Sequence, residues 1–347
     1  MADFSHLGGH SPEWVEFSKQ LSLPPRSNFT ANLDMKAIRQ TINSQRFLAR
    51  NEELKAMVNY GVKCETIMVV TSDYLEIPIR LYTPPKRRNP ASVLLYFYGG
   101  GFFSGSLSVD DAACIHLAQK CGLVVVSVGY RLTPEWKAPT QFQDAWDARC
   151  WVLQNPEALG MSPPFNLYVM GISAGACLAA SIVIRERMIR ISGEAVIKGQ
   201  SLCVPWLCLP EKFPIEEILP EKASPTQCRD AALLPYSWVT KYADMLDTPE
   251  SHRDSPVINP LLFDEQVVTS LPPSHIMVCG DDPLRDHGML MKQKLDRLRV
   301  STKLHTYPGY PHFFRRFPNC PANKSWDNDL LEGIEWMMAQ SEMKSQE

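Results

Sequence analysis

The chain has 347 residues, enough for about two domains of ~150 residues, although α/β folds of this length often form one unit. Hydrophobic residues make up 45% of the chain and charged residues 21%, which excludes a disordered chain, a collagen-like fibre and a coiled coil. The net charge is −3, without the basic excess of nucleic-acid-binding proteins, so nucleic acid is not expected as a partner.

The N-terminal 62 residues predict helices. Met35, Ile38 and Ile42 are spaced to share one helix face. The first residues have neither the basic nor the apolar stretch of a signal peptide, and no run approaches the ~18 apolar residues of a membrane span. The cysteines form no CxxC pair and are expected to be reduced thiols. We therefore expect a cytoplasmic protein with no membrane span, in which residues 1–62 form a helical cap segment.

Residues 63–347 predict a core in which strands and helices alternate. The inner strands are apolar throughout, as in strands that are buried on both faces of a parallel sheet. Helical segments lie between them, and residues 141–153 carry one apolar stripe. This alternation implies an α/β fold with right-handed crossovers. The predicted strands are residues 63–71, 76–82, 92–98, 123–130, 167–170, 275–279 and 303–307.

Residues from about 209 to 262 interrupt this rhythm. They are rich in prolines and charges and contain one predicted helix, YSWVTKYADML. We interpret them as a cap or lid insertion between two late strands. Together with the N-terminal helices, it would cover the carboxyl-terminal edge of the sheet, where open α/β sheets bind ligands.

The strongest local signal is GISAG at residues 171–175. It directly follows a predicted strand and opens a helix-compatible run, which is the context of a nucleophile elbow. The glycines permit a sharp, strained turn that would expose Ser173 above the sheet. The alternative is a plain strand-to-helix turn, but an acid and a histidine follow downstream, as an elbow requires.

A serine hydroxyl needs a base, and His312 is the candidate. It lies in a loop just past the last strand, whereas His305 falls inside that strand and His287 follows the acidic loop too closely. The acidic loop offers Asp281, Asp282 and Asp286. We favour Asp282, because Pro283 stiffens the loop beside it, while its neighbours are placed to cap the next helix.

Three consecutive glycines follow Tyr98. Such a loop lets backbone N–H groups approach a ligand closely. No lysine follows at the spacing of a phosphate-binding loop, so we predict an oxyanion hole formed by the N–H groups of Gly100, Gly101 and Ala174. The sequence has neither HExxH nor GxGxxG after the first strands, so neither a metal nor another cofactor is expected.

The motifs together resemble the hormone-sensitive-lipase-like carboxylesterases of the α/β-hydrolase superfamily. YGGGFFSG resembles the family's HGGGF loop, GYRLTPE its DYRLAPE block and GISAG its GDSAG elbow, while DPLRDHG and YPGYPHFF resemble its acid and histidine blocks. The resemblance covers residues 60 to 340. It implies an α/β-hydrolase fold, with a mostly parallel eight-stranded sheet flanked by helices and a helical cap. It also implies Ser173, Asp282 and His312 as the catalytic triad.

Three positions depart from the family pattern. Tyr98 replaces the histidine that supports the glycine loop, and its phenol can also donate a hydrogen bond. Ile172 and Gly129 replace two aspartates. The reactive positions are all kept, so catalysis is expected.

The sequence therefore predicts a cofactor-independent serine esterase that acts on a short-acyl ester of a small molecule. The resemblance extends to tailoring esterases of fungal secondary metabolism. Two alternatives remain. One is a lactonase, acyltransferase or dehydratase with the same triad, and the other is a non-catalytic small-molecule receptor. A homodimer is the oligomer we consider.

Overall fold

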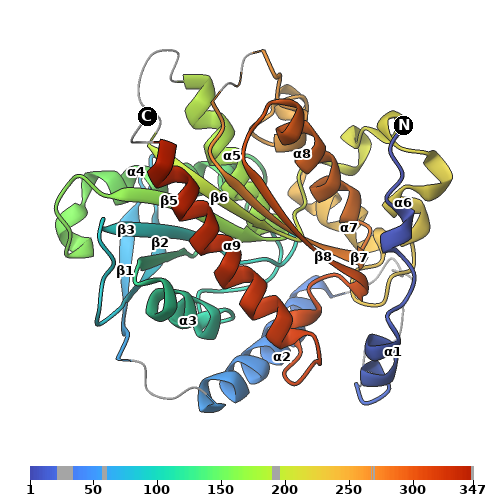
Figure 1. The fold of residues 1–347 in the computed structure, drawn as a ribbon, viewed down its shortest axis with the longest axis horizontal. Coiled ribbons are helices and arrows are strands. Elements are labelled where there is room, and N and C mark those ends of the chain that lie inside the picture. The colour runs from blue at the N-terminus through green and yellow to red at the C-terminus, as the bar shows by residue number, and fades with distance from the viewer. Residues whose placement is uncertain (22–33, 57–60, 190–195, 267, 269, 345–347) are drawn as a thin grey trace.

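One eight-stranded sheet forms the centre of the computed structural model, which describes residues 1–21, 34–56, 61–189, 196–266, 268 and 270–344 (Figure 1). The strand order is β1-β2-β4-β3-β5-β6-β7-β8. The pairs β1–β2 and β2–β4 are antiparallel, and the remaining neighbours are parallel. The strands are β1 (Lys63–Val70), β2 (Glu76–Thr83), β3 (Ser92–Phe97), β4 (Val124–Val128), β5 (Asn166–Ile172), β6 (Ile197–Cys203), β7 (Ser274–Asp281) and β8 (Thr302–Pro311).

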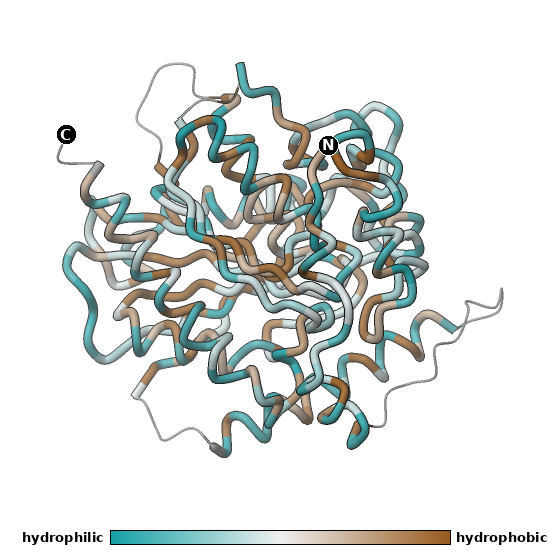
Figure 2. Tube along the Cα trace, turned by 45° about the vertical axis from the view of Figure 1, so that its right-hand side comes forward, coloured by the Kyte–Doolittle hydropathy of each residue, from teal (hydrophilic) through white to brown (hydrophobic). Residues whose placement is uncertain are grey.

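The mostly parallel sheet confirms the predicted fold class. Every residue of β3, β4 and β7 is buried, as their continuous apolar runs predict. Figure 2 shows these central strands as hydrophobic and the outer elements as mixed. The strand β6 is the one that the pattern analysis did not place. Its sequence, IKGQSLC, is interrupted by polar residues, and two of them bond to β7: Gln200 to Ser274, and Ser201 to His275.

Helices cover both faces of the sheet. The helices α3 and α9 pack on one face, while α5 and α8 pack on the other, with α4 against α5. The apolar stripe predicted at 141–153 corresponds to α4. The helices are α1 (Pro12–Ser18), α2 (Met35–Ala56), α3 (Asp111–Cys121), α4 (Thr140–Gln154), α5 (Ala174–Ile189), α6 (Ser224–Gln227), α7 (Tyr236–Leu246), α8 (Arg285–Arg297) and α9 (Asn323–Lys344).

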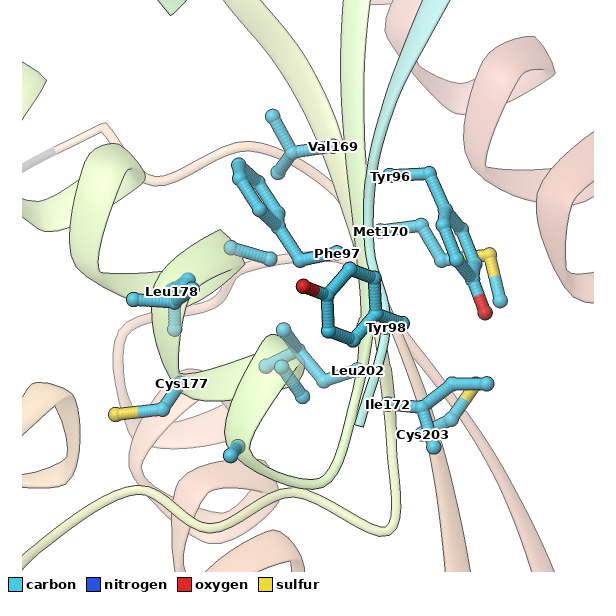
Figure 3. Packing of buried hydrophobic residues seen from close by; sticks show 14 of the residues in the cluster. Tyr96, Phe97, Tyr98, Val169, Met170, Ile172, Cys177, Leu178, Leu202 and Cys203 are labelled. Atoms are coloured by element: carbon cyan, nitrogen blue, oxygen red, sulfur yellow. The ribbon is translucent and has the colours of Figure 1, made fainter. Parts of the chain in front are cut away.

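Buried side chains of β3, β5, β6 and α5 pack together in the core (Figure 3). Phe97 points from β3 toward α5, where Leu178 lies, whereas Tyr96 and Met170 point to the opposite face (Figure 3). This alternation follows from the two-residue period of a strand. All five central strands from β3 to β7 are therefore held between two apolar layers, which gives the loops at their carboxyl ends a rigid base.

Two segments lie at the carboxyl ends of the strands. The helix α2 is capped by Asp34, whose Oδ1 accepts the N–H groups of Lys36 and Ala37. Residues 209–262 lie between β6 and β7 and contain α6, several 3₁₀ turns and α7, which spans the predicted YSWVTKYADML. Figure 1 shows both segments at the ends of β7 and β8. Residues 22–33 and 57–60 of the predicted N-terminal segment lie outside the described residues.

Two smaller expectations concern membranes and thiols. Among the described helices, none combines the length and apolarity that crossing a membrane requires. All ten cysteines are free thiols, and eight of them are buried. Burial raises the pKa of several of them, for example Cys203 to about 12, so they behave as small apolar side chains.

Candidate active site

Ser173 lies in the turn between β5 and α5. Its backbone is left-handed, with φ at 56°, which is unusual for a residue with a side chain. The turn is tight on both sides. A Cβ on Gly175 would lie 2.1 Å from the carbonyl oxygen of Phe97, and one on Gly171 would lie 2.1 Å from that of Gly175. Only glycine fits at either position, so GISAG folds as the strained elbow expected from the sequence.

His312 reaches Ser173 from the far edge of the sheet. It is the first residue after β8, and Phe313, with φ at 46°, turns the chain away immediately after it. The imidazole Nε2 lies 3.0 Å from the Ser173 hydroxyl oxygen. Both side chains are more than 90% buried, so bulk water does not compete for this hydrogen bond.

Asp282 contacts the other nitrogen of the His312 ring. Its Oδ2 lies 2.7 Å from Nδ1 of His312, and its Oδ1 accepts the N–H of Leu284 at 2.8 Å. The carboxylate can only accept hydrogen bonds, so the Nδ1 of His312 must carry the proton. That tautomer leaves Nε2 free to take a proton from Ser173.

The other two acids of this loop have different partners. Asp281 contacts Nδ1 of His10 at 3.1 Å. Asp286 pairs with Arg285 and accepts the N–H of Ser224. Neither contacts His312 within hydrogen-bond distance, so the structure brings only Asp282 of the three to the histidine.

His305 and His287, which the sequence analysis set aside, contact other residues. His305 is inside β8 and contacts His275, with 3.1 Å between Nδ1 and Nε2. His287 lies in α8, where Nδ1 accepts the N–H of Leu207 at 3.2 Å. Burial lowers the pKa of His287 to about 3, so this imidazole stays neutral.

The glycine loop follows β3 and faces the elbow. Gly100 and Gly101 both have positive φ, at 141° and 65°, which turns their N–H groups out of the strand direction. Ala174 is the first residue of α5. In the described part of the chain, none of the N–H groups of Gly100, Gly101 and Ala174 donates a hydrogen bond to another protein group. Three such unused donors suit a developing oxyanion.

Tyr98 supports the glycine loop together with a residue that the sequence analysis did not single out. Its ring stacks on Tyr130 with centroids 4.6 Å apart. The Tyr130 hydroxyl donates to the carbonyl oxygen of Tyr98 at 2.7 Å, while the Tyr98 hydroxyl reaches the carbonyl oxygen of Tyr130 at a longer 3.4 Å. The firmer bond therefore comes from Tyr130. Tyr130 belongs to the GYRLTPE block, but the motif does not indicate its partner, because the pairing joins residues 32 positions apart.

The helix α2 holds both ends of the glycine loop. Arg46 donates from Nη1 to the carbonyl oxygen of Gly99 at 2.8 Å, and the Asn43 Oδ1 accepts the N–H of Gly105 at 2.9 Å. From the other side, the Tyr242 ring of α7 lies against Gly101. Sequence reasoning assigned no role to Arg46, Asn43 or Tyr242, since amphipathic spacing places a helix face without identifying what it contacts.

One group of side chains has the composition of a metal site. His305, Asp329 and Glu332 bring ligand atoms within 4.8 Å of one another. Asp329 accepts the Tyr307 hydroxyl at 2.7 Å, and Glu332 pairs with Lys303. These carboxylates already have donors within the protein, and none of the group contacts Ser173 or His312.

Comparison with known proteins points to one family. The model of the alpha/beta hydrolase fold matches residues 94–316. An ethyl acetate hydrolase of Pseudomonas putida is 32% identical over 72% of this chain and 75% of its own length. A versiconal hemiacetal acetate esterase of Dothistroma septosporum is 28% identical over 80% of this chain and 82% of its own length. The solved structure of a vibralactone cyclase superposes with a TM-score of 0.85 at 26% identity, covering 98% and 99% of the two chains.

One further match is partial. A protein of Aspergillus terreus named FAD-linked oxidoreductase pytB is 31% identical over 75% of this chain, but the chain spans only 31% of that protein. The family model covers more than half of the chain, and the esterases match over most of their own length. The chain therefore belongs to the carboxylesterase family of the α/β-hydrolase fold.

Proposed function

We propose that the protein hydrolyses carboxylic esters through Ser173, His312 and Asp282. In the first half of the reaction, His312 Nε2 takes the hydroxyl proton while Ser173 Oγ bonds to the ester carbonyl carbon. The N–H groups of Gly100, Gly101 and Ala174 stabilise the oxyanion that forms. His312 then gives the proton to the leaving alkoxide, and the acyl group remains on Ser173.

In the second half, water takes the place of the alcohol. His312 removes a proton from the water, whose oxygen bonds to the acyl carbon. Collapse of the second oxyanion returns the proton to Ser173 Oγ and releases the acid. Asp282 stays ionised throughout and stabilises the imidazolium. The observation that carries this proposal is the continuous pair of hydrogen bonds, 3.0 Å from Ser173 to His312 and 2.7 Å from His312 to Asp282.

Removing the serine hydroxyl tests the proposal. Ser173→Ala should lower kcat on 4-nitrophenyl acetate on the order of 10⁴-fold or more and abolish labelling by a fluorophosphonate. Ser181→Ala is the matched control, because its hydroxyl is buried in α5, the helix that follows Ser173, and has no hydrogen-bond partner among the residues that the structure describes. Equal turnover by the two variants, with circular dichroism unchanged, would refute the role of Ser173.

For the substrate we propose a short-acyl ester of a small molecule, with fungal secondary metabolites as one candidate class. Names of relatives support this class: one is an ethyl acetate hydrolase and another a versiconal hemiacetal acetate esterase. Rates on esters of graded acyl length measure the preference. A rate that rises steadily from acetyl to long acyl groups would contradict it.

The similarity to a vibralactone cyclase favours one alternative, ring closure in place of hydrolysis. The two outcomes differ in the group that attacks the acyl-enzyme, which is water in one and a hydroxyl of the substrate in the other. Reaction in ¹⁸O-labelled water distinguishes them, because only hydrolysis places the label in the product acid. We further propose that residues 1–62 and 209–262 act as the cap. A cytoplasmic location and a homodimer stay predictions.

A further inference from the structure

A small cavity is bordered by the chain neighbours of two candidate triad residues. Its volume is about 50 Å³, and it lies between α2, the start of α3 and α9. Ile172 and Phe313, the chain neighbours of Ser173 and His312, form part of its wall. Figure 3 shows Ile172 pointing away from α5, on the side of the strand where Met170 also lies. The cavity is therefore next to the reacting groups but on the other side of the strand from the elbow helix.

Charged side chains dominate the rest of the wall. Four arginines and three carboxylates line it, so its lining carries one excess positive charge. The carboxylates are all paired. Arg315 binds Asp327 at 2.6 Å and also pairs with Glu53, while Arg46 lies 3.5 Å from Asp110. Arg50, the third arginine of the wall, is bonded to Asp111, which does not line the cavity.

Arg316 is the cation left without a counterion. It ends the 3₁₀ turn Phe314–Arg316 that follows His312, and its side chain is half-buried over the ring of Phe317, 5.1 Å from the centroid. Among the residues that the structure describes, no carboxylate lies within ion-pair distance of its guanidinium. Burial and the nearby Arg46 lower the pKa of Arg316 to about 10, so it remains charged at pH 7.

A half-buried, unneutralised guanidinium is costly, and an anion offsets that cost. The planar guanidinium group of arginine matches the geometry of a carboxylate, which can accept two parallel hydrogen bonds from it. The cavity of about 50 Å³ is larger than the roughly 10–15 Å³ that a cavity needs to hold one water, so it has room for a group of a few atoms such as a carboxylate.

We propose that Arg316, with Arg46 beside it, binds a free carboxylate of the substrate, so that the enzyme prefers esters that carry an acid group. This inference rests on the proposed esterase function. Because the chain neighbours of Ser173 and His312 form part of the cavity wall, the acid group would act as a specificity determinant rather than as a remote effector. Arg316 would touch the substrate without taking part in the acyl transfer.

Matched ester pairs test this preference. Monoethyl adipate and ethyl hexanoate have equal acyl length and differ by the acid on the acyl side. The pair of 4-acetoxybenzoate and 4-methylphenyl acetate differs by the acid on the alcohol side. For at least one pair we expect a higher kcat/KM for the acidic member. Arg316→Met should lower the ratio of acidic to neutral kcat/KM roughly 10- to 100-fold, mainly through KM, as expected for a lost charged hydrogen bond.

Two further variants sharpen the test. Arg316→Lys keeps the charge and should retain part of the preference, whereas Arg297→Met, at an exposed arginine at the end of α8, should leave the ratio unchanged. An unchanged ratio in Arg316→Met, or no preference in the unaltered protein for either pair, would overturn the inference.

A binding measurement separates this inference from the proposed function. In Ser173→Ala, which leaves the cavity intact, monoethyl adipate or 4-acetoxybenzoate should bind more tightly than its neutral partner in an NMR titration. Adding Arg316→Met should remove the difference. If the unaltered protein hydrolyses no ester and resists fluorophosphonate, the proposed function fails, yet this titration still decides whether Arg316 binds the acid. Equal Kd values within each pair would overturn the inference.

Discussion

Asp282 shows how neighbouring residues of one type acquire different roles. Asp281 ends β7, Asp282 follows it and Asp286 lies in the first turn of α8, and all three are buried. The first contacts His10, the last pairs with Arg285, and Asp282 alone contacts His312. Sequence reasoning favoured Asp282 because Pro283 follows it. In the structure the Asp282 carboxylate also accepts the N–H of Leu284, the residue after Pro283, which holds it in place.

A pair of isosteric substitutions tests this difference. Asp282→Asn should lower kcat on the order of 10⁴-fold, because the amide favours the wrong imidazole tautomer. Asp281→Asn is the neighbouring control and should keep kcat within about threefold, since its contact is to the exposed His10. Ester hydrolysis measures both. Similar losses in the two variants would mean that Asp282 is not the triad acid.

Contacts between residues of different motifs could not be predicted from the sequence. Tyr98 was expected to support the glycine loop by donating a hydrogen bond, but the shorter bond runs from Tyr130 to the Tyr98 carbonyl. Burial raises the pKa of Tyr130 well above its ordinary range, so its hydroxyl remains a donor. Such long-range partners depend on packing, which no local spacing encodes.

At the scale of elements, the elbow helix and the glycine loop are in direct contact. Gly175, in the first turn of α5, faces the carbonyl oxygens of Phe97 and Tyr98 so closely that an added Cβ would lie 2.1 and 2.5 Å from them. The two halves of the predicted oxyanion hole are thus fixed relative to each other through one glycine. This explains why GISAG and the glycine loop, far apart in sequence, are informative together.

Gly175→Ala should therefore push the start of α5 away from the glycine loop. We expect a loss of ~1–3 kcal/mol in the free energy of unfolding from overpacking and a fall in kcat of about 100-fold from the displaced donors. Urea denaturation and ester hydrolysis measure the two effects. Gly160→Ala is a control for a strained substitution away from the candidate site, since Gly160 has a φ of 60° and an added Cβ would meet the end of the Arg87 side chain rather than backbone. Its kcat should not change, and an equal loss in both variants would argue against the contact described here.

Element prediction succeeded where residue type and burial agree. The apolar strands β3, β4 and β7 and the helix α7 followed from pattern alone. The strand β6 was missed because Gln200 and Ser201 make its sequence polar, although both are buried and hydrogen-bond to side chains of β7. Pattern analysis treats a polar residue as exposed, and only the neighbouring strand supplies the partner that lets it be buried.

At the scale of the whole molecule, the buried histidines govern the response to acid. His287 is neutral, and its Nδ1 accepts a backbone N–H, so protonation would break that bond inside the core. Its pKa of about 3 in the folded protein lies below the ordinary value of 6.5. The unfolded chain therefore binds the extra proton, and stability is full above pH 6.5 and falls as the pH drops toward 3.

The contribution of His287 is measurable. Between pH ~6.5 and the folded-state pKa, His287 should lower the free energy of unfolding by about 1.4 kcal/mol for each pH unit of acidification. His287→Asn keeps an acceptor for Leu207 without a titrating group, so its stability should fall less steeply between pH 6.5 and 4.5. His6→Asn, at an exposed position, should leave the slope unchanged. Denaturant titrations at several pH values give the slopes, and parallel lines for all three proteins would rule out this role.

The hydrogen bonds from α2 to the glycine loop limit how the specificity of this enzyme could change. Asn43 and Arg46 bond to main-chain atoms at both ends of the loop that would stabilise the reaction intermediate. Exchanging the N-terminal region between relatives would change substrate access and intermediate stabilisation at the same time. New specificities that arise through this helix must therefore preserve both anchors, which restricts chimeric designs to grafts that carry an amide and a guanidinium three residues apart.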